Sequence, residues 1–394
     1  MINWPALEAA NAPLNAFVDW DKNASSGNGP LAGVTMGVKS NIAVAGLPWT
    51  GGMALHRHRI AERDAEVVAK LRAAGATILG TLNMHEAALG ATTDNAFYGR
   101  TINPHREGYT PGGSSGGSGA AVAAGLCDAA LGTDTLGSVR IPAAYCGAYG
   151  LKPTNGFVST DGLAFLEPSL DVIGPLARSL DMLERIWSVI AEDNPIEALP
   201  VKRMLLLEGL GGVAVEPAVR AAYEKACILL DLPIQHLRLA DPLSDIRMAG
   251  FGAAGRWLIA DLGAARSLNA ELLSEELKFL LKVCENAPDR PDILARTRDT
   301  LRAVIDEDTI LLMPTAPQAA FAHGRAPVNQ ADFTALANIA GLPALALPAG
   351  WSEDGLPVSI QLVGAAASEA TLFAVARQLD MALDAYRQPA TFGT

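Results

Sequence analysis

Short apolar runs and one clear helical pattern alternate in the first 155 residues. Val67, Val68 and Leu71 recur at helical spacing, Asp64 stands where a helix cap is expected, and Gly75 ends the pattern. The other apolar runs are too short for helices, which favours buried strands. The predicted order is strand, helix, strand, helix, strand over residues 34–38, 64–75, 76–79, 118–126 and 128–132. This rhythm is typical of an α/β fold with helices on both faces of a parallel or mixed sheet.

The middle of the chain, roughly residues 180–305, is dominated by helical patterns. The clearest cover residues 216–230 and 271–284, and the apolar run 204–207 is the one strand predicted there. No motif with recognisable chemistry falls in this part of the sequence.

From about residue 308 the strand pattern returns. Strands are predicted at 310–313, 344–347 and 358–363, and Ser368 then caps a closing helix. We therefore expect a single domain over residues 1–394, built on a mixed, twisted sheet. Its core comprises residues 30–190 and 308–385, and a helical, substrate-facing insertion spans about 190–305.

Charge and composition exclude several classes of partner. Lys and Arg number 30 against 42 Asp and Glu, so the net charge of −12 has the wrong sign for phosphate backbones or anionic lipids. The first residues lack a leader pattern, and no apolar run reaches about 18 residues without Pro or a charge. We expect no nucleic-acid or membrane partner and, by default, a cytoplasmic location.

The cysteines and histidines show no spacing suited to a metal or a disulfide framework. The four cysteines are far apart, and a reduced, buried state is expected for them. The six histidines are expected to be structural or to lie on the surface. They are His56, His58, His85, His105, His236 and His323.

The stretch Tyr109-Thr-Pro-Gly-Gly-Ser-Ser-Gly-Gly-Ser-Gly119 is the most unusual part of the sequence. Its composition fits a flexible linker, a structural turn, or a catalytic or anion-binding loop. It lacks the Gly-Lys-Ser/Thr ending of a phosphate-binding P-loop and the G-x-G-x-x-G pattern of a dinucleotide site. All three interpretations remain open on composition alone.

Element lengths favour the catalytic interpretation of this stretch. A helix of about ten residues from Gly117 covers roughly 15 Å, and a five-residue return strand covers about 17 Å. The loop at 133–140 would then face Ser114 and Ser115. Two serine-bearing turns that meet at the end of a strand are a candidate active site.

The motifs around these turns resemble the amidase signature family. The main signature is similar over some forty residues, and shorter motifs occur upstream and downstream. The matching stretches are Gly37-Val-Lys-Ser-Asn-Ile42, Gly112-Gly-Ser-Ser-Gly-Gly-Ser118, Gly132-Thr-Asp-Thr-Leu-Gly-Ser-Val-Arg-Ile-Pro-Ala143, Cys146-Gly-Ala-Tyr-Gly-Leu-Lys-Pro-Thr154, Asp171-Val-Ile-Gly-Pro175, Met313-Pro-Thr315, Asn338-Ile-Ala-Gly-Leu-Pro343 and Leu356-Pro-Val-Ser-Ile-Gln-Leu362.

The resemblance implies the amidase signature fold and a Ser–Ser–Lys triad. Ser138 would be the nucleophile, Ser114 the bridging serine and Lys39 the base. In the family a cis peptide bond precedes the bridging serine, which here would join Gly113 to Ser114. Ser115 is a rival for the bridge, but the family's spacing of 24 residues to the nucleophile selects Ser114.

This chemistry places a demand on the lysine. A serine hydroxyl is a weak nucleophile until a neighbouring base takes its proton, and a lysine can do so only when neutral. An unperturbed lysine has a pKa of about 10.4, so burial must lower it by about two units or more. Without the other motifs, Lys39 would be interpreted as a solvated lysine at a strand end.

The resemblance also implies supporting residues and an activity. The backbone N–H groups of Thr135, Leu136, Gly137 and Ser138 would form the oxyanion hole. Asp134 and Arg140 would hold this turn, with substrate contact a lesser alternative for Arg140. The expected reaction is hydrolysis of a small-molecule amide through an acyl-enzyme, without metal or organic cofactor.

Two positions depart from the family pattern. Ser40 stands where an acidic residue commonly follows the lysine, and serine can serve as a turn residue there. Leu136 replaces a glycine, so it would be strained if the position required positive φ. Its side chain must project beside the nucleophile, which predicts a narrowed acyl pocket that favours small substrates.

Alternatives to a small-amide hydrolase remain at this point. The chain is short for the A component of a tRNA-dependent amidotransferase, which works with partner subunits, and fits malonamidase-like or indoleacetamide-hydrolase-like branches better. A catalytically impaired amidase scaffold and, more weakly, a phosphate-ligand binder are the other candidates. A homodimer is compatible with each of them.

Overall fold

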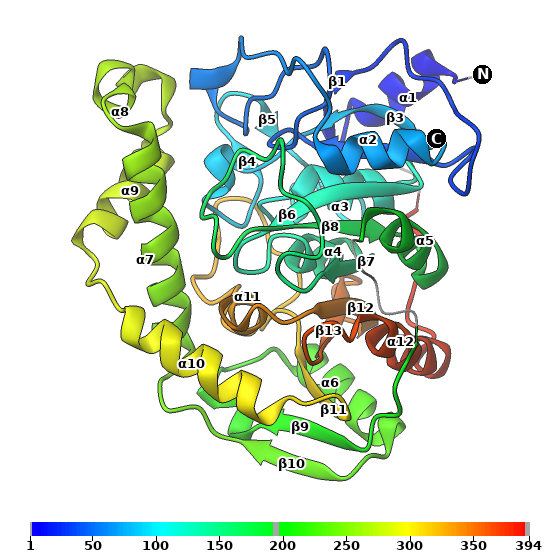
Figure 1. Cartoon of the computed structure of the whole chain (residues 1–394), viewed down its shortest axis with the longest axis vertical. Helices are drawn as coiled ribbons and strands as arrows, with labels where there is room; N and C mark the ends of the chain where they lie inside the picture. The colour runs from blue at the N-terminus through cyan, green and yellow to red at the C-terminus, as the bar shows by residue number, and fades with distance from the viewer. Residues whose placement is uncertain (1, 192–196, 391–394) are drawn as a thin grey trace.

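The computed structural model describes residues 2–191 and 197–390, and its centre is one large mixed β-sheet (Figure 1). Within these residues the sheet has eleven strands. In spatial order they are β1 (Phe17–Trp20), β3 (Thr77–Leu82), β2 (Thr35–Lys39), β6 (Ala129–Asp134), β8 (Val172–Ala177), β7 (Tyr149–Lys152), β12 (Ala344–Trp351), β13 (Pro357–Val363), β11 (Thr309–Pro314), β9 (Arg203–Leu207) and β10 (Ile234–Leu237). Two short strands, β4 (Asp94–Asn95) and β5 (Gly99–Arg100), pair separately.

Parallel and antiparallel pairing are both present in the large sheet. β2 pairs in parallel with β3 and β6, and β9 pairs in parallel with β11 and β10. The strands between these two groups are antiparallel. The mixed sheet predicted from the sequence is therefore confirmed.

Apolar residues on both faces of the strands explain why helices cover both faces. In β6, Ala129 and Leu131 belong to one core cluster and Ala130 to another, as expected when successive side chains point to opposite faces. The first cluster includes Val67 and Leu71 of the second helix, and the other includes Ala121 of the third. A sheet covered on both faces is the α/β arrangement expected from the sequence.

Twelve α-helices surround the sheet in the described part of the chain. They are α1 (Trp4–Asn11), α2 (Glu66–Ala73), α3 (Gly116–Ala123), α4 (Arg140–Cys146), α5 (Leu180–Ile190), α6 (Pro217–Leu230), α7 (Leu243–Leu262), α8 (Ala265–Leu268), α9 (Glu275–Asn286), α10 (Pro291–Val304), α11 (Ala335–Ala340) and α12 (Glu369–Leu383). Short 3₁₀ turns lie at Ala54–His56, Glu86–Ala88, Glu208–Gly212 and Ala270–Leu272. No helix in the described ranges combines the length and apolarity needed to cross a bilayer.

The middle part of the chain contains more strand than the sequence indicated. β9 was predicted, but β10 was missed, and both extend the sheet beyond β11. Ile234, Gln235 and His236 are exposed and only Leu237 is buried, so this edge strand carries no apolar signal. The helices α7 to α10 of this part lie along one side of the molecule, at the left in Figure 1.

Two predicted helix caps are wrong. α2 begins at Glu66, and the Asp64 carboxylate accepts the Ala45 N–H at 2.8 Å instead of capping the helix. Ser368 occupies the cap position of α12, but its hydroxyl makes no cap hydrogen bond. In both cases tertiary packing stabilises the helix without the local bond, as is common for amphipathic helices.

Candidate active site

The glycine-rich stretch is an ordered, buried loop that leads into α3. Gly112 has φ +85°, and the Gly113–Ser114 peptide bond is cis. A Cβ atom on Gly113 would lie 2.7 Å from the Thr92 backbone nitrogen, so no side chain fits there. Ser114 and Ser115 are fully buried. These contacts exclude the flexible-linker interpretation.

Ser115 joins this loop to the turn after β6. Its N–H donates to the Ser138 carbonyl at 3.3 Å. Its hydroxyl donates to the Thr133 carbonyl and accepts the Thr133 N–H, both at 3.2 Å. The two serine-bearing turns therefore meet at the end of β6, where the element lengths predicted.

Lys39 ends β2 and reaches the same point from the neighbouring strand. Its side chain is fully buried, and Nζ lies 2.7 Å from both Ser114 Oγ and Thr133 Oγ1. Burial lowers the pKa of the Lys39 ammonium to about 7, although Asp171 and Asp134 oppose the shift. A large fraction of this lysine is therefore neutral near pH 7, as the chemistry inferred from the sequence requires.

Three polar residues near Lys39 were not predicted as site residues. The Asn41 amide nitrogen lies 3.2 Å from Thr133 Oγ1, so Thr133 is held by both Lys39 and Asn41. Asp171 accepts a hydrogen bond from the Thr135 hydroxyl and two from the N–H groups of Leu166 and Glu167. All three residues lie inside the quoted motifs, so the motifs themselves were the available signal.

Asp134 and Arg140 form a fully buried ion pair that holds the turn between β6 and α4. Arg140 donates twice to Asp134 at 3.0 Å, and also to Gln361 and Asn338. Burial alone would raise the pKa of Asp134, but Arg140 and Asn338 hold it at about 2. Because the Arg140 guanidinium is committed to these partners, the structure favours support of the turn over substrate contact.

Within the expected oxyanion hole, the Gly137 N–H requires a correction. It donates to Asp134 Oδ1 at 2.6 Å and is therefore not directed at a substrate oxygen. Gly137 has φ +132°, and a Cβ atom would overlap the Thr334 side chain. Glycine is thus required here because it lets the turn fold back onto the Asp134 carboxylate.

Leu136 is accommodated without backbone strain. It is not among the residues with positive φ, so the conditional strain considered from the sequence does not arise. Its carbonyl accepts a hydrogen bond from Thr334 at 2.6 Å. Its side chain lies against α7, where a Cβ atom on Gly250 would be only 2.9 Å from Leu136 Cδ2.

Ser138 is half-buried at the wall of a cavity of about 530 Å³. The cavity is lined by residues 88–92, by Thr135, Leu136 and Ser138, by α7 and α9, and by residues 326–331. Among the described residues the Ser138 hydroxyl makes no hydrogen bond. The structure thus brings Lys39 and Ser114 into contact and places Ser138 beside them through its backbone, with its side chain at the cavity.

One histidine lies close to this site. His85 is buried, its N–H donates to the Ser114 carbonyl at 3.0 Å, and its Nδ1 lies 3.2 Å from the Thr92 hydroxyl. Burial lowers the pKa of its imidazole to about 4, so the ring is neutral at pH 7. In the described part of the chain, no three His, Cys, Asp or Glu side chains gather as metal ligands would.

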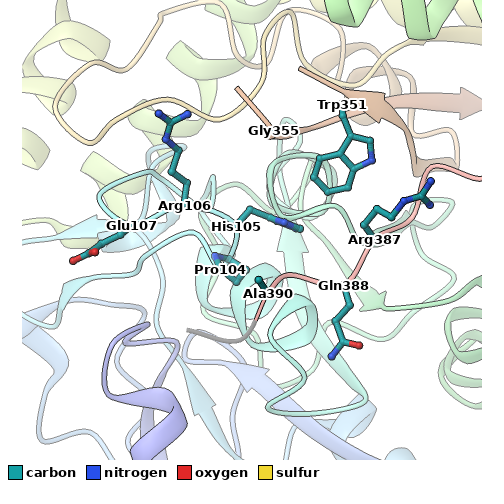
Figure 2. Close-up of a pocket in the computed structure, with 9 residues that line it drawn as sticks. All are labelled: Pro104, His105, Arg106, Glu107, Trp351, Gly355, Arg387, Gln388 and Ala390. Carbon is teal, nitrogen blue, oxygen red and sulfur yellow. The ribbon is translucent and has the colours of Figure 1, made fainter. Parts of the chain in front are cut away.

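A larger and more open hollow, of about 750 Å³, lies elsewhere on the molecule (Figure 2). Its walls carry Trp351 and His105, whose rings are 5.3 Å apart, together with residues near the end of the described chain. His105 Nε2 lies 3.0 Å from the Cys146 carbonyl. No residue predicted for catalysis lines this hollow.

Comparison with known proteins gives consistent matches over nearly the whole chain. A family model described as Amidase matches residues 6–203 and 271–373. The A component of the glutamyl-tRNA(Gln) amidotransferase of Synechococcus sp. (strain CC9311) is 32% identical, covering 90% of this chain and 84% of that protein.

Solved structures agree with the sequence matches. The A component of the glutamyl-tRNA(Gln) amidotransferase of Thermotoga maritima superposes with a TM-score of 0.86 and 27% identity, covering 99% of this chain and 94% of that one. A structure described as an amidase gives a TM-score of 0.85 and 28% identity, covering 96% and 94%.

Proposed function

The chain belongs to the amidase family, whose members act on amide bonds, and from this premise we propose that it hydrolyses a small carboxamide through an acyl-enzyme at Ser138. The observation that carries the proposal is the buried Lys39 amine, 2.7 Å from Ser114 Oγ, with a pKa of about 7. A neutral amine in this position can accept the Ser114 proton while it donates to Thr133.

The proposed reaction has two halves. Ser138 Oγ attacks the amide carbon, its proton passes to Ser114, and the Ser114 proton passes to Lys39. The proton then returns through Ser114 to the leaving nitrogen as the C–N bond breaks. Water attacks the resulting ester by the same relay, which releases the carboxylate and restores the Ser138 hydroxyl.

The backbone N–H groups of Thr135, Leu136 and Ser138 are proposed to stabilise the oxyanion of each tetrahedral intermediate. Gly137 takes a different part, because its N–H anchors the turn to Asp134. Donors fixed in this way need no reorganisation as charge develops, which is why such groups contribute strongly to acyl transfer. No metal or organic cofactor enters this proposal.

A second candidate is the A component of an amidotransferase. The specific observation in its favour is the match to the Synechococcus protein of that description over 90% of the chain. The two candidates differ in what the isolated chain does. A small-amide hydrolase releases ammonia from simple amides alone, whereas an amidotransferase component should depend on glutamine and on its partner proteins.

Fluorophosphonate labelling tests whether the relay is functional. The reagent should modify Ser138 in the wild type, and Ser138→Ala and Lys39→Ala should each abolish labelling. Ser118→Ala is a matched control, because Ser118 is a buried serine of the same loop whose hydroxyl donates to the Leu131 carbonyl. A wild type that stays unlabelled would favour an impaired scaffold or a phosphate-ligand binder instead.

A panel of amides then tests the substrate class. Malonamate, propionamide, an arylacetamide and glutamine should be compared for ammonia release by the purified chain. Turnover of glutamine alone among these would favour the amidotransferase candidate.

Further features of the proposal concern organisation and location. The division into a core at 30–190 and 308–385 and a substrate-facing part at about 190–305 is supported by the α7 and α9 residues that line the cavity. A homodimer and a cytoplasmic location complete the proposal, and sedimentation and cell fractionation would test them.

A further inference from the structure

Two charged side chains line the cavity at Ser138, and one of them is already neutralised. Arg247 of α7 donates to Asp332 Oδ1 at 2.6 Å. Both side chains are largely buried, so each compensates the charge of the other in a low-dielectric setting. A substrate carboxylate that approached Arg247 would have to compete with Asp332.

The second charged side chain, Glu276 of α9, lacks such a partner. Its nearest ionisable neighbour is His85, with Nε2 3.7 Å from Glu276 Oε1. Because the pKa of His85 is about 4, this imidazole carries no charge at pH 7. Among the described residues no lysine or arginine pairs with Glu276, so the cavity contains one uncompensated negative charge.

The surroundings of Glu276 would strengthen its effect on a ligand. Phe279, Leu280 and Val283 follow at helical spacing and line the same cavity, and Met248 and Phe251 face it from α7. Burial and the Asp94 carboxylate raise the pKa of the Glu276 carboxyl. A bound cation would relieve both effects, and the chain's net charge of −12 also favours cations over anions.

We propose that Glu276 is a specificity-determining residue, which makes the enzyme select amides whose apolar acyl chain ends in a cationic group over matched amides that end in a carboxylate. The apolar walls bind the chain, and the Glu276 carboxylate pairs with a primary ammonium at its end. This inference rests on the proposed function, since it assigns the substrate class of the same site.

The test uses matched straight-chain primary amides that end in methyl, ammonium or carboxylate. Heptanamide, 6-aminohexanamide and pimelic acid monoamide form one such set, and sets one and two carbons shorter and longer scan the reach to Glu276. Ammonia release is measured at pH 8, where Lys39 is largely neutral and an alkyl ammonium is still charged.

In the wild type, kcat/KM for the ammonium-ended amide should exceed that for the carboxylate-ended amide by about tenfold or more at the best chain length. Glu276→Gln should lower this ratio about tenfold. Glu275→Gln is the matched control, because Glu275 lies one residue away on the same helix, is 91% exposed and pairs with Lys278. That variant should keep the wild-type ratio.

An unchanged ratio in Glu276→Gln would overturn the inference, as would a preference for the carboxylate-ended amide, which would point to Arg247. Because each ratio compares substrates on one protein sample, partial misfolding of a variant does not alter it. Calorimetric binding of the same amides to Ser138→Ala separates this inference from the proposed function. Charge-selective binding without turnover in the wild type would contradict hydrolysis and leave the role of Glu276 standing, whereas binding without selectivity would overturn it.

Discussion

Lys39 shows how far a single side chain can be altered by its place in the fold. A lysine between a valine and a serine at the end of a short strand is ordinarily solvated, and nothing in its immediate neighbours requires otherwise. In the structure β2 is flanked by β3 and β6, so its end is enclosed and the amine is fully buried. Desolvation then favours the neutral form, which is the form able to accept a proton.

The first prediction is a pH profile governed by this amine. Since only neutral Lys39 acts as a base, kcat/KM should rise about tenfold per pH unit below pH 7 and level off above it. Asp171, whose pKa burial raises to about 6, ionises just below this range and should steepen the acid limb. Initial rates with one neutral amide between pH 5 and pH 9 check this, and a flat profile below pH 7 would contradict it.

The second prediction concerns stability and the same ammonium. Folding lowers the pKa of Lys39 to about 7 from about 10.4 in the unfolded chain, so between these values the unfolded state binds one more proton. Wild-type stability relative to Lys39→Met should therefore increase by about 1.4 kcal/mol per pH unit from pH 7 to pH 10. Urea unfolding at several pH values measures this slope.

The control for that slope is Lys22→Met, which removes an exposed ammonium paired with Glu8. Equal slopes for the two variants would show that the ammonium at position 39 does not cause the effect.

The third prediction concerns Leu136, which lines the cavity beside Ser138 and packs against Gly250. Leu136→Ala should raise kcat/KM for an arylacetamide relative to propionamide by roughly tenfold, because several methyl and methylene groups leave the acyl pocket. Rates for both amides on both proteins provide the measurement. Wild-type enzyme that turns over bulky aromatic and small aliphatic amides equally would contradict the narrowed pocket.

At the scale of elements, the turn between β6 and α4 depends on α11, which lies some 200 residues later in the sequence. Asn338 of α11 donates to both the carbonyl and the carboxylate of Asp134 at 2.9 Å. Thr334, just before α11, donates to the Leu136 carbonyl. The shape of the candidate oxyanion turn is therefore stabilised by a helix far away in the chain.

The fourth prediction follows from this close approach. Gly137→Ala places a methyl group against Thr334 at a φ of +132°, so the turn must move away from α11. We expect activity to fall at least a hundredfold and stability to fall by about 1 to 3 kcal/mol. Steady-state rates and thermal unfolding measure the two effects, with Gly324→Ala in an open loop as the comparison.

Prediction of the elements from the sequence succeeded where the apolar pattern was strong. The central strands and the amphipathic helices were found because their buried residues recur at the right period. β10 was missed because three of its four residues are exposed, and α7 because small residues spread around its whole circumference leave no clear stripe. The caps failed at Asp64 and Ser368 because both side chains are placed by tertiary packing.

At the scale of the whole molecule, the candidate relay was reached by resemblance more than by periodicity. The positions of Lys39, Ser114 and Ser138 came from motifs, and element lengths alone indicated only that two serine-bearing turns meet. The commitment of the Gly137 N–H to Asp134 and the pairing of Arg247 with Asp332 were beyond prediction. Both depend on side chains brought together across long stretches of chain.

The cavity walls on α7 and α9 belong to a different stretch of sequence from the loops that carry the lysine and the serines. Substitutions in residues 243–286 can therefore redirect which amides are accepted while the proton relay keeps its geometry. Exchange of this segment between relatives should transfer substrate preference as a unit, which makes it a natural target for directed evolution of new amidases.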